Sequence, residues 1–198
     1  MLPIIDEILC RKPGTIISID TTKSKVAEQA LKSGASILND ISGGTFDKNI
    51  FNVVKDFNAG MVIMHTKDKP KTMQESPFYN EVVSEVYDYL TTQTGIAAEV
   101  GINKIIIDPG IGFGKRIEDN LNLIERLEDF RSLGFPILIG LSRKSFIGNI
   151  LNLPVEERDD VTTVLNSFSL GNGARIIRTH NFKQGIQTCK IFNRLKSN

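Results

Sequence analysis

The chain has 198 residues, of which 40% are hydrophobic and 24% are charged. This length and composition fit one globular domain with a sizeable core, and the chain is too polar for a membrane protein. Its 24 basic and 23 acidic residues give a net charge of +1, which offers no basic field to concentrate nucleic acid or anionic lipid. We therefore expect neither nucleic acid nor a membrane as a partner.

The two cysteines and the first ten residues indicate where such a protein would reside. Cys10 and Cys189 stand near opposite ends of the chain, without the spacing of a metal site. Residues 1–10 carry two acids within an apolar stretch and no basic n-region, which predicts a helix rather than a signal peptide. Together these features predict a cytoplasmic protein with free thiols.

Short apolar runs alternate with helix-like segments along the chain, and polar residues follow each run. Regular alternation of this kind predicts a parallel α/β sheet, because each strand returns to the sheet through a helix. Near-continuous runs such as Ile105-Ile106-Ile107 predict strands that are buried on both faces or lie inside a barrel. The six expected strands cover residues 15–20, 36–40, 60–65, 104–108, 136–142 and 174–180.

The segments between these strands predict helices and one long loop. The 118–132 segment has Leu121, Ile124 and Leu127 at helical spacing. The polar stretch 66–80 predicts a mobile loop over the ligand face. No linker interrupts the pattern, so a single domain over residues 1–198 is expected. Helices are expected over residues 24–32, 81–100 and 118–132, with C-cap glycines at Gly34, Gly101 and Gly134.

Polar residues close the first two expected strands. Asp20 stands just before a helix, so it either binds a ligand or caps that helix. Asn39 and Asp40 precede Gly43 and Gly44, where paired glycines either let a ligand approach the backbone or form a turn. Neither pattern alone decides between the two interpretations.

Asp108 closes the fourth expected strand and is the more specific signal. Pro109 fixes the backbone after it, and alternating glycines at 110, 112 and 114 predict an open loop with free amides. The spacing matches neither Gly-x-Gly-x-x-Gly nor Gly-x-x-x-x-Gly-Lys-Ser/Thr, which argues against a dinucleotide or a nucleoside triphosphate. We favour a ligand-binding role for Asp108 over a structural one.

Cationic residues follow the last two expected strands. Arg143, Lys144 and Ser145 come after a buried strand, where unpaired cations would be costly unless an anionic or carbonyl-bearing ligand meets them. The alternative is a solvated loop end. Arg178 and His180 alternate within the last expected strand, so both would point to one side and suggest anion binding. Their alternative role is to be satisfied by core carboxylates such as that of Asp20.

Seven motifs in order resemble those of the dihydropteroate synthases, the pterin-binding (β/α)8 barrels that make the folate precursor. The resemblance covers essentially the whole chain, although Asn181 stands where the family more often has aspartate. It implies an α/β fold, a partial TIM barrel of about six parallel strands alternating with helices. The motifs are Ser-Ile-Asp-Thr (18–21), Asn-Asp-Ile-Ser-Gly-Gly (39–44), Met-His (64–65), Pro-Lys-Thr-Met-Gln (70–74), Asp-Pro-Gly-Ile-Gly-Phe-Gly-Lys (108–115), Ser-Arg-Lys-Ser-Phe-Ile-Gly (142–148) and Arg-Ile-Ile-Arg-Thr-His (175–180).

The resemblance implies a transferase reaction in which 4-aminobenzoate displaces pyrophosphate from 6-hydroxymethyl-7,8-dihydropterin pyrophosphate, with Mg²⁺ as the metal cofactor. Carboxylates can accept from the N–H groups of a pterin edge, while amide and ammonium groups can serve its acceptors. The implied catalytic residues are Lys144, Arg178 and His180, of which the last two bind pyrophosphate. The implied substrate-binding residues also include Asp20, Asn39 and Asp108 on the pterin edge, Met64 and Phe113 packing near the ring, Gly140 leaving space for it, and Arg143 and Ser145 near 4-aminobenzoate.

The family's first two βα units have no counterpart here: motifs of the Asn-Val-Thr-Pro-Asp-Ser-Phe-Ser and Gly-Gly-Glu-Ser-Thr-Arg-Pro-Gly types, with the metal-binding asparagine, do not occur. We therefore expect exposed apolar edges at 16–19 and 176–179, and a homodimer or a complementing N-terminal polypeptide as partner. Two further hypotheses stay open. One is a non-catalytic pterin-binding fragment or split-enzyme subunit, and the other is a folate-binding methyltransferase, which resembles residues 142–148 less well.

Overall fold

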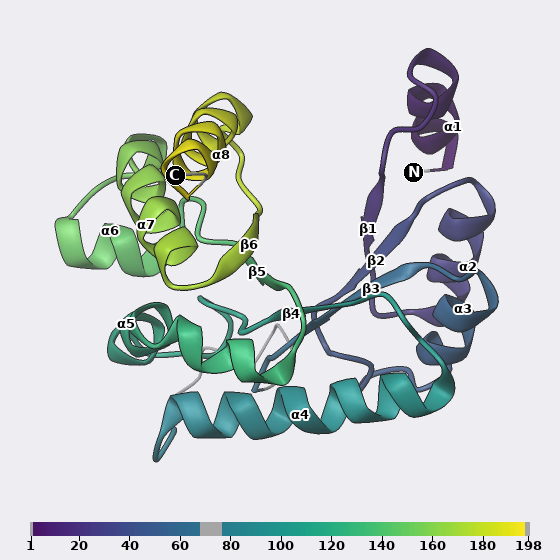
Figure 1. The fold of residues 1–198 in the computed structure, drawn as a ribbon, viewed down its shortest axis with the longest axis horizontal. Coiled ribbons are helices and arrows are strands. Elements are labelled where there is room, and N and C mark those ends of the chain that lie inside the picture. The colour runs from purple at the N-terminus through teal and green to yellow at the C-terminus, as the bar shows by residue number, and fades with distance from the viewer. Residues whose placement is uncertain (1, 68–76, 197–198) are drawn as a thin grey trace. The chain divides into compact units, whose positions relative to one another are not determined.

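A computed structural model describes residues 2–67 and 77–196 of the chain (Figure 1). Within these residues, six strands form one sheet in the order β1-β2-β3-β4-β5-β6 and alternate with helices. The pairs β1–β2, β2–β3 and β5–β6 are parallel. The strands are β1 Ser18–Asp20, β2 Ile37–Asp40, β3 Gly60–Met64, β4 Ile105–Asp108, β5 Ile137–Ile139 and β6 Ala174–Ile177.

All six expected strands are confirmed, and their bounds differ mainly at the ends. β1 begins at Ser18 rather than at residue 15, and β6 ends at Ile177 rather than at residue 180. The pairing of β5 with β6 also shifts, because Ile137 pairs with Ala174 while Leu138 pairs with Ile176. The extra residue in β6 is Arg175, which forms a bulge and is exposed.

The chain divides into two compact units, and the expectation of a single domain stays a prediction. The first unit comprises Met1–Thr66 and Asp88–Ile107. Its core includes β3, every residue of which is buried, as expected of a parallel strand that is covered on both faces. The helices of this unit are α1 Leu2–Arg11, α2 Ser24–Lys32, α3 Ile50–Asp56 and the larger part of α4 Val82–Val100.

The second unit comprises Lys67–Tyr87 and Asp108–Asn198. Helices α7 and α8 lie side by side in it (Figure 1). The expected helix 118–132 is broken at Arg126 into an α-helix and a 3-10 helix. The helices of this unit are α5 Ile117–Glu125, η1 Leu127–Leu133, α6 Ser145–Leu151, η2 Val155–Glu157, α7 Asp159–Gly171 and α8 Phe182–Lys196.

The apolar spacing in the 118–132 segment was only partly informative. Ile124 and Leu127 are buried, with 3% and 0% of their surfaces exposed, but Leu121 is 41% exposed. Leu121 and Ile124 belong to α5, whereas Leu127 begins the 3-10 helix η1, so the three positions do not share one face of a single α-helix. The C-cap glycines at 34, 101 and 134 have φ of +100°, +101° and +81°, which confirms the expected helix ends.

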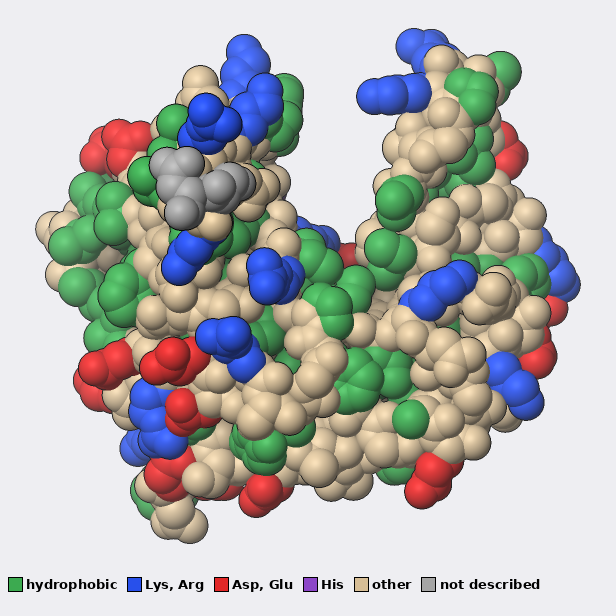
Figure 2. Space-filling view, in the orientation of Figure 1, with side chains coloured by type: hydrophobic (Ala, Val, Ile, Leu, Met, Phe, Trp, Pro, Cys, Tyr) green, Lys and Arg blue, Asp and Glu red, His purple; other side chains and the backbone are tan. Residues whose placement is uncertain are grey.

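Charged side chains of both signs are interspersed over the face drawn in Figure 2, in keeping with the net charge of +1. None of the helices in the described ranges is long and apolar enough to cross a membrane.

Candidate functional site

In the first unit, Asp20 and Asn39 lie next to each other at the carboxyl ends of β1 and β2. They are direct partners in the parallel pairing, and Asn39 Nδ2 donates a hydrogen bond to Asp20 Oδ1 at 3.1 Å. Asn39 is buried, whereas Asp20 is exposed. The amide therefore orients a carboxylate that faces outward. Met64, at the end of β3, is packed into the core with 2% of its surface exposed.

The alternative role of Asp20 as a helix cap is not observed. The backbone N–H of Ser24, at the start of α2, donates to Asp47 Oδ2 at 2.7 Å. Hydrogen bonding with Ser24, first with its side chain and then with this N–H, lowers the pKa of the Asp47 carboxyl. Because Asp47 and not Asp20 caps this helix end, ligand binding remains the predicted role of Asp20.

The residues after Asn39 form a turn that Asp40 holds together. Its Oδ1 accepts from the N–H and the hydroxyl of Ser42, and its Oδ2 accepts from the N–H of Gly44 at 2.8 Å. A Cβ at Gly43 would lie 2.7 Å from the Tyr89 hydroxyl, and one at Gly44 would meet the Phe51 ring. The turn interpretation is therefore confirmed. The idea that the paired glycines make room for a ligand is wrong, because aromatic side chains of the protein fill that space.

In the second unit, the Asp108 carboxylate is buried at the end of β4, with 7% of the residue exposed. Its Oδ1 accepts from the N–H of Gly110 at 2.8 Å. Burial raises the pKa of Asp108 to about 6, while that hydrogen bond and the charges of Lys144, Lys115 and Arg178 act in the opposite direction. Asp108 is thus a buried acid in the field of three cationic side chains.

The loop after Asp108 is fixed by hydrogen bonds from several elements. The Gly112 N–H donates to Asn120 Oδ1 at 2.6 Å, and the Tyr79 hydroxyl donates to the Gly114 carbonyl at 2.8 Å. The expectation of free amides is therefore wrong at Gly110 and Gly112, whose N–H groups donate hydrogen bonds to the side chains of Asp108 and Asn120. Sequence reasoning missed Asn120 and Tyr79. The only signal would have been that buried loop amides need acceptors and buried loop carbonyls need donors.

Lys144 lies against this loop. Its Nζ is 3.9 Å from the centre of the Phe113 ring, a cation–π contact, and a Cβ at Gly112 would lie 2.7 Å from Lys144 Cδ. Burial lowers the pKa of Lys144. The charge of Asp108 opposes this lowering, and the charge of Arg178 adds to it. The sequence predicted Phe113, Asp108 and Lys144 as ligand-binding residues in separate motifs. In the structure, Lys144 contacts the Phe113 ring and interacts electrostatically with Asp108.

Arg143 is an ion-pair partner rather than a bare cation. Its Nε and Nη2 donate to Asp159 Oδ1 and Oδ2 at 2.7 and 2.9 Å, and this side-chain bond lowers the pKa of Asp159 to about 2. Asn181 Nδ2 donates to the same carboxylate at 3.2 Å. The premise that Arg143 and Lys144 are unpaired is therefore wrong, because Asp159 binds one and the Phe113 ring covers the other.

Arg178 and His180 lie beyond the end of β6, and both are exposed. The prediction that they alternate within the strand is wrong, since the strand ends at Ile177 after its bulge. His180 Nδ1 is 2.8 Å from Ser142 Oγ, which also accepts from the His180 backbone N–H at 3.1 Å. Ser142, and not a core carboxylate, therefore fixes this histidine.

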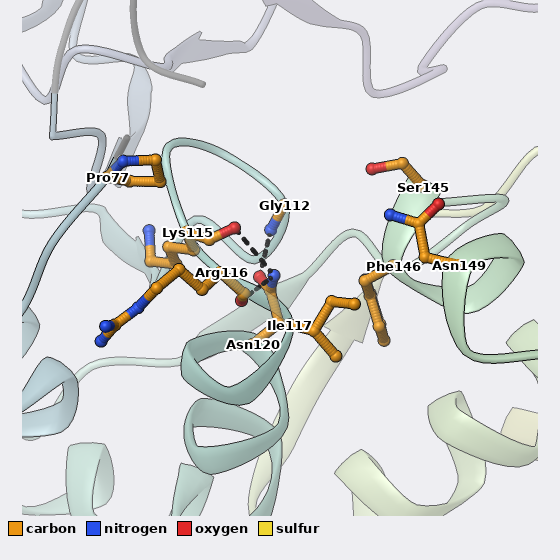
Figure 3. A pocket seen from close by; sticks show the side chains of 9 residues that line it. All are labelled: Pro77, Gly112, Lys115, Arg116, Ile117, Asn120, Ser145, Phe146 and Asn149. Carbon is orange, nitrogen blue, oxygen red and sulfur yellow. Dashed lines mark hydrogen bonds between the residues drawn. The ribbon is translucent and has the colours of Figure 1, made fainter. Parts of the chain in front are cut away.

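A pocket of about 240 Å³ opens between the first turns of α5 and α6 (Figure 3). In Figure 3, Asn120 accepts a hydrogen bond from the Gly112 N–H on one side of the pocket. Ser145 and Asn149 face the pocket from α6. Ser145 is exposed there. At the end of β5, a Cβ built on Gly140 meets no atom within 4 Å, so this strand end also borders open space. The pocket is lined by Pro77, Gly112, Lys115, Arg116, Ile117, Asn120, Ser145, Phe146 and Asn149.

Residues 2–67 and 77–196 contain no group of three or more His, Cys, Asp or Glu that could hold a metal ion. The described side chains therefore do not fit a self-contained Mg²⁺ site, and magnesium stays a prediction. The expected motif at 70–74 lies outside the described residues.

The alternating strands and helices, with buried acid and cationic groups at strand ends, define an α/β protein of the kind that binds small molecules at the carboxyl edge of its sheet. The sequence model of the family described as "Pterin binding enzyme" matches residues 1–180. The chain belongs to this family, as the sequence motifs predicted.

Two similar curated proteins are dihydropteroate synthases. A dihydropteroate synthase of Synechocystis sp. is 41% identical over 182 residues, 90% of this chain and 63% of the relative. A dihydropteroate synthase of Bacillus subtilis is 37% identical over 195 residues, 98% of this chain and 66% of the relative. The chain thus spans slightly under two thirds of the length of these curated relatives.

Solved structures bear out the fold. The dihydropteroate synthase of Thermus thermophilus in complex with 4-aminobenzoate is 34% identical, with a TM-score of 0.93 over 99% of this chain and 80% of that one. The same enzyme in complex with 6HMPPP has a TM-score of 0.93 over 99% of this chain and 78% of that one. The predicted fold class, part of the family's α/β barrel, is confirmed.

Proposed function

We propose that this protein acts in dihydropteroate synthesis, where the amine of 4-aminobenzoate displaces pyrophosphate from 6-hydroxymethyl-7,8-dihydropterin pyrophosphate. The amine nitrogen forms a bond to the pterin methylene carbon, the carbon–oxygen bond to pyrophosphate breaks, and the amine loses a proton. The names of the relatives and the two complexes of the Thermus thermophilus enzyme support this proposal.

The observation that carries the proposal is the buried Asp108 carboxylate among cationic side chains. A buried acid is costly unless something compensates it, and a pterin edge with its N–H groups is a suitable partner. Lys144, held at the Phe113 ring, would serve the acceptor atoms of the same ring system. In the first unit, the Asp20–Asn39 pair offers an acceptor that is oriented by an amide, and a role for this pair in ligand binding stays a proposal of its own.

The exposed Arg178 and His180 are proposed to bind the pyrophosphate. Negative charge grows on this group as its bond to carbon breaks, so fixed cationic groups stabilise the transition state more than the ground state. Ser142 fixes the His180 ring through the contact at 2.8 Å, which keeps one edge of the imidazole in place. A histidine held in this way can also donate to a phosphate oxygen when it is protonated.

The carboxylate of 4-aminobenzoate is proposed to bind at Ser145, in the pocket drawn in Figure 3. Ser145 is the first residue of α6 and is exposed at this pocket, so its hydroxyl can donate to a carboxylate oxygen. Arg143, the other residue expected here, is bound to Asp159 and would act by holding the loop before Ser145. Magnesium, if it takes part, remains a proposal without a described site.

The partner is proposed to be a second copy of this chain or a polypeptide that supplies the rest of the family's fold. Large apolar side chains that are exposed on two adjacent helices, α7 and α8, support association. They are Val164, Phe168, Phe182, Ile186, Ile191 and Leu195, with exposed fractions from 50% to 71%.

The test is product formation by the purified chain with pterin pyrophosphate, Mg²⁺ and 4-aminobenzoate, alone and with a polypeptide covering the part of the Bacillus subtilis relative that this chain does not match. Pterin binding is measured in parallel. Product formation in either assay supports the synthase. Product only in the assay with the second polypeptide shows that this polypeptide is required. Binding without product in both arms supports a non-catalytic pterin-binding protein, and absence of binding overturns the proposal.

A further inference from the structure

Lys115 is a buried cation that borders the pocket of Figure 3 but has been given no role in ligand binding above. It ends the loop that follows Asp108, and only 5% of its surface is exposed. Its Nζ turns back into the loop and donates to the Gly110 carbonyl at 2.8 Å and to the Phe113 carbonyl at 3.1 Å. The side chain therefore bridges the two ends of a four-residue segment from inside.

The surroundings of Lys115 show why a cation is tolerated there. Burial lowers the pKa of Lys115 to about 7, and the carboxylate of Asp108, followed by that of Asp119, opposes this shift. Lys144 and Lys67 add to the lowering by repulsion. A buried ammonium group is stable only when hydrogen bonds and opposite charge replace its water, and here two carbonyls and a carboxylate do so.

The two carbonyls that Lys115 binds belong to residues that contact the proposed pterin-binding groups. Gly110 is fixed on both sides, because its carbonyl accepts from Lys115 and its N–H donates to Asp108. The carbonyl of Phe113 is fixed by the same ammonium group, and the ring of that residue carries the Lys144 Nζ at 3.9 Å. Lys115 thus contacts the backbone of two residues, Gly110 and Phe113. The Gly110 N–H orients Asp108, and the Phe113 ring orients Lys144.

We propose that Lys115 is a positioning residue. It holds the 110–114 loop in the shape in which Asp108 and Lys144 face a pterin, without touching the ligand itself. This inference rests on the proposed function for its effect on binding. Its structural part, the bridging of the loop, can be tested on the free protein.

The first experiment measures amide hydrogen exchange of residues 110–114 in the free protein and in Lys115→Met, which keeps the length of the side chain but has no donor. Two lost hydrogen bonds predict exchange that is faster by about tenfold or more. Lys104→Met is the matched control, since Lys104 Nζ also donates to a backbone carbonyl, that of Asn58 at 2.8 Å, outside this loop. Unchanged protection of the loop in Lys115→Met overturns the inference.

The second experiment measures pterin affinity and the Michaelis constant for 4-aminobenzoate. Lys115→Met is expected to weaken pterin binding by about tenfold, as the loss of a positioned charge-assisted contact would. The constant for 4-aminobenzoate should change by less than about threefold, because Lys115 borders the pocket of Figure 3 while its Nζ is bonded to the Gly110 and Phe113 carbonyls inside the loop. Equal loss for both substrates would indicate a merely structural role and would contradict positioning.

Two further variants keep the outcome decisive. Lys115→Gln retains an N–H donor, so it should keep more loop protection and pterin affinity than Lys115→Met, or than Lys115→Ala if Lys115→Met does not fold. Equal losses count against positioning by hydrogen bonds. In Lys115→Ala, added ethylammonium should restore pterin binding, since it can occupy the space of the lost amine, whereas no restoration counts against positioning by the ammonium group. If the wild type does not bind pterin, the proposed function fails, while the exchange measurement still decides the role of Lys115.

Discussion

The Nζ of Lys144 lies 3.9 Å from the centre of the Phe113 ring. This contact joins the residue before α6 to the loop after β4 within the second unit, so that two residues expected to meet one pterin already meet each other. The aromatic face holds the cation in place without neutralising it. Lys144 is therefore held in position before a ligand arrives, and its charge remains available to the ligand.

Lys144→Ala should weaken pterin binding far more than it weakens the fold. A charge-assisted hydrogen bond contributes about 1.5–3 kcal/mol, which predicts an affinity loss of about 10- to 100-fold. The cation–π contact contributes about 0.5–1 kcal/mol to the fold, so the melting temperature should fall by only about 2–4 °C. Fluorescence titration and thermal unfolding measure the two effects. A fall in stability as large as the loss of binding energy would argue against the ligand role.

Gly112→Ala should disturb the site, and Gly134→Ala provides a matched control. Both glycines have φ near +80°, namely +82° and +81°, so both substitutions carry the same backbone strain. An added Cβ at Gly112 would also lie 2.7 Å from Lys144 Cδ, whereas one at Gly134 meets nothing within 4 Å. We expect similar destabilisation of about 1 kcal/mol in both variants, with at least about tenfold weaker pterin binding in Gly112→Ala alone. Equal binding by the two variants would contradict the proposed site.

The Arg143–Asp159 pair should contribute to stability in a way that depends on pH. The folded-state pKa of Asp159 is lowered from 3.8 to about 2, so its contribution is present above about pH 4 and is lost as the pH falls toward 2. The Arg143 side chain is 35% exposed, so we expect a coupling energy of only about 1 kcal/mol at pH 7. A double-mutant cycle of Arg143→Ala and Asp159→Ala, followed by urea unfolding at pH 7 and pH 2.5, measures it. A coupling that does not decrease at pH 2.5 would refute this assignment.

Asp108 should have the opposite dependence on pH. Its folded-state pKa is raised from 3.8 to about 6, so the folded protein binds more protons than the unfolded chain between these values. The contribution of Asp108 to the free energy of unfolding is therefore greatest below about pH 4 and is lost as the pH rises to about 6. Asp108→Asn removes this titration. Between pH 4 and pH 6 the stability of the wild type should fall relative to that of Asp108→Asn, and a rising or constant difference would show that the carboxylate is not held in a buried, proton-retaining site.

The strand positions could be predicted from the sequence because their signals are local. A run such as Ile105-Ile106-Ile107 is buried whichever neighbour it pairs with, and the polar residue that ends the run marks the carboxyl edge. Asp108 was predicted in this way. The bulge at Arg175 could not be predicted, because it depends on how β6 is paired with β5 rather than on the composition of either strand.

The contacts that hold the site lie further apart in the chain. Asp159 is 16 residues from Arg143, and Tyr79 is 35 residues from the carbonyl of Gly114 that it binds. Nothing in the local sequence indicates that these groups meet, because tertiary packing brings them together. Arg143 therefore looked like a free cation in the sequence and is an ion-pair partner in the structure. The residue types of the site could be predicted, but the residues that position them could not.

Direct titration of 6-hydroxymethylpterin into the purified wild type and Gly140→Ala tests the central claim, which is that this chain binds a pterin at its strand ends. Gly140 has room for a Cβ in the free protein, with no atom within 4 Å, so this substitution should leave the fold intact and intrude only on a bound ligand. The account predicts saturable binding by the wild type and at least about tenfold weaker binding by Gly140→Ala at an unchanged melting temperature. Equal binding by both proteins would place the pterin elsewhere, and absence of binding to the wild type would contradict the account.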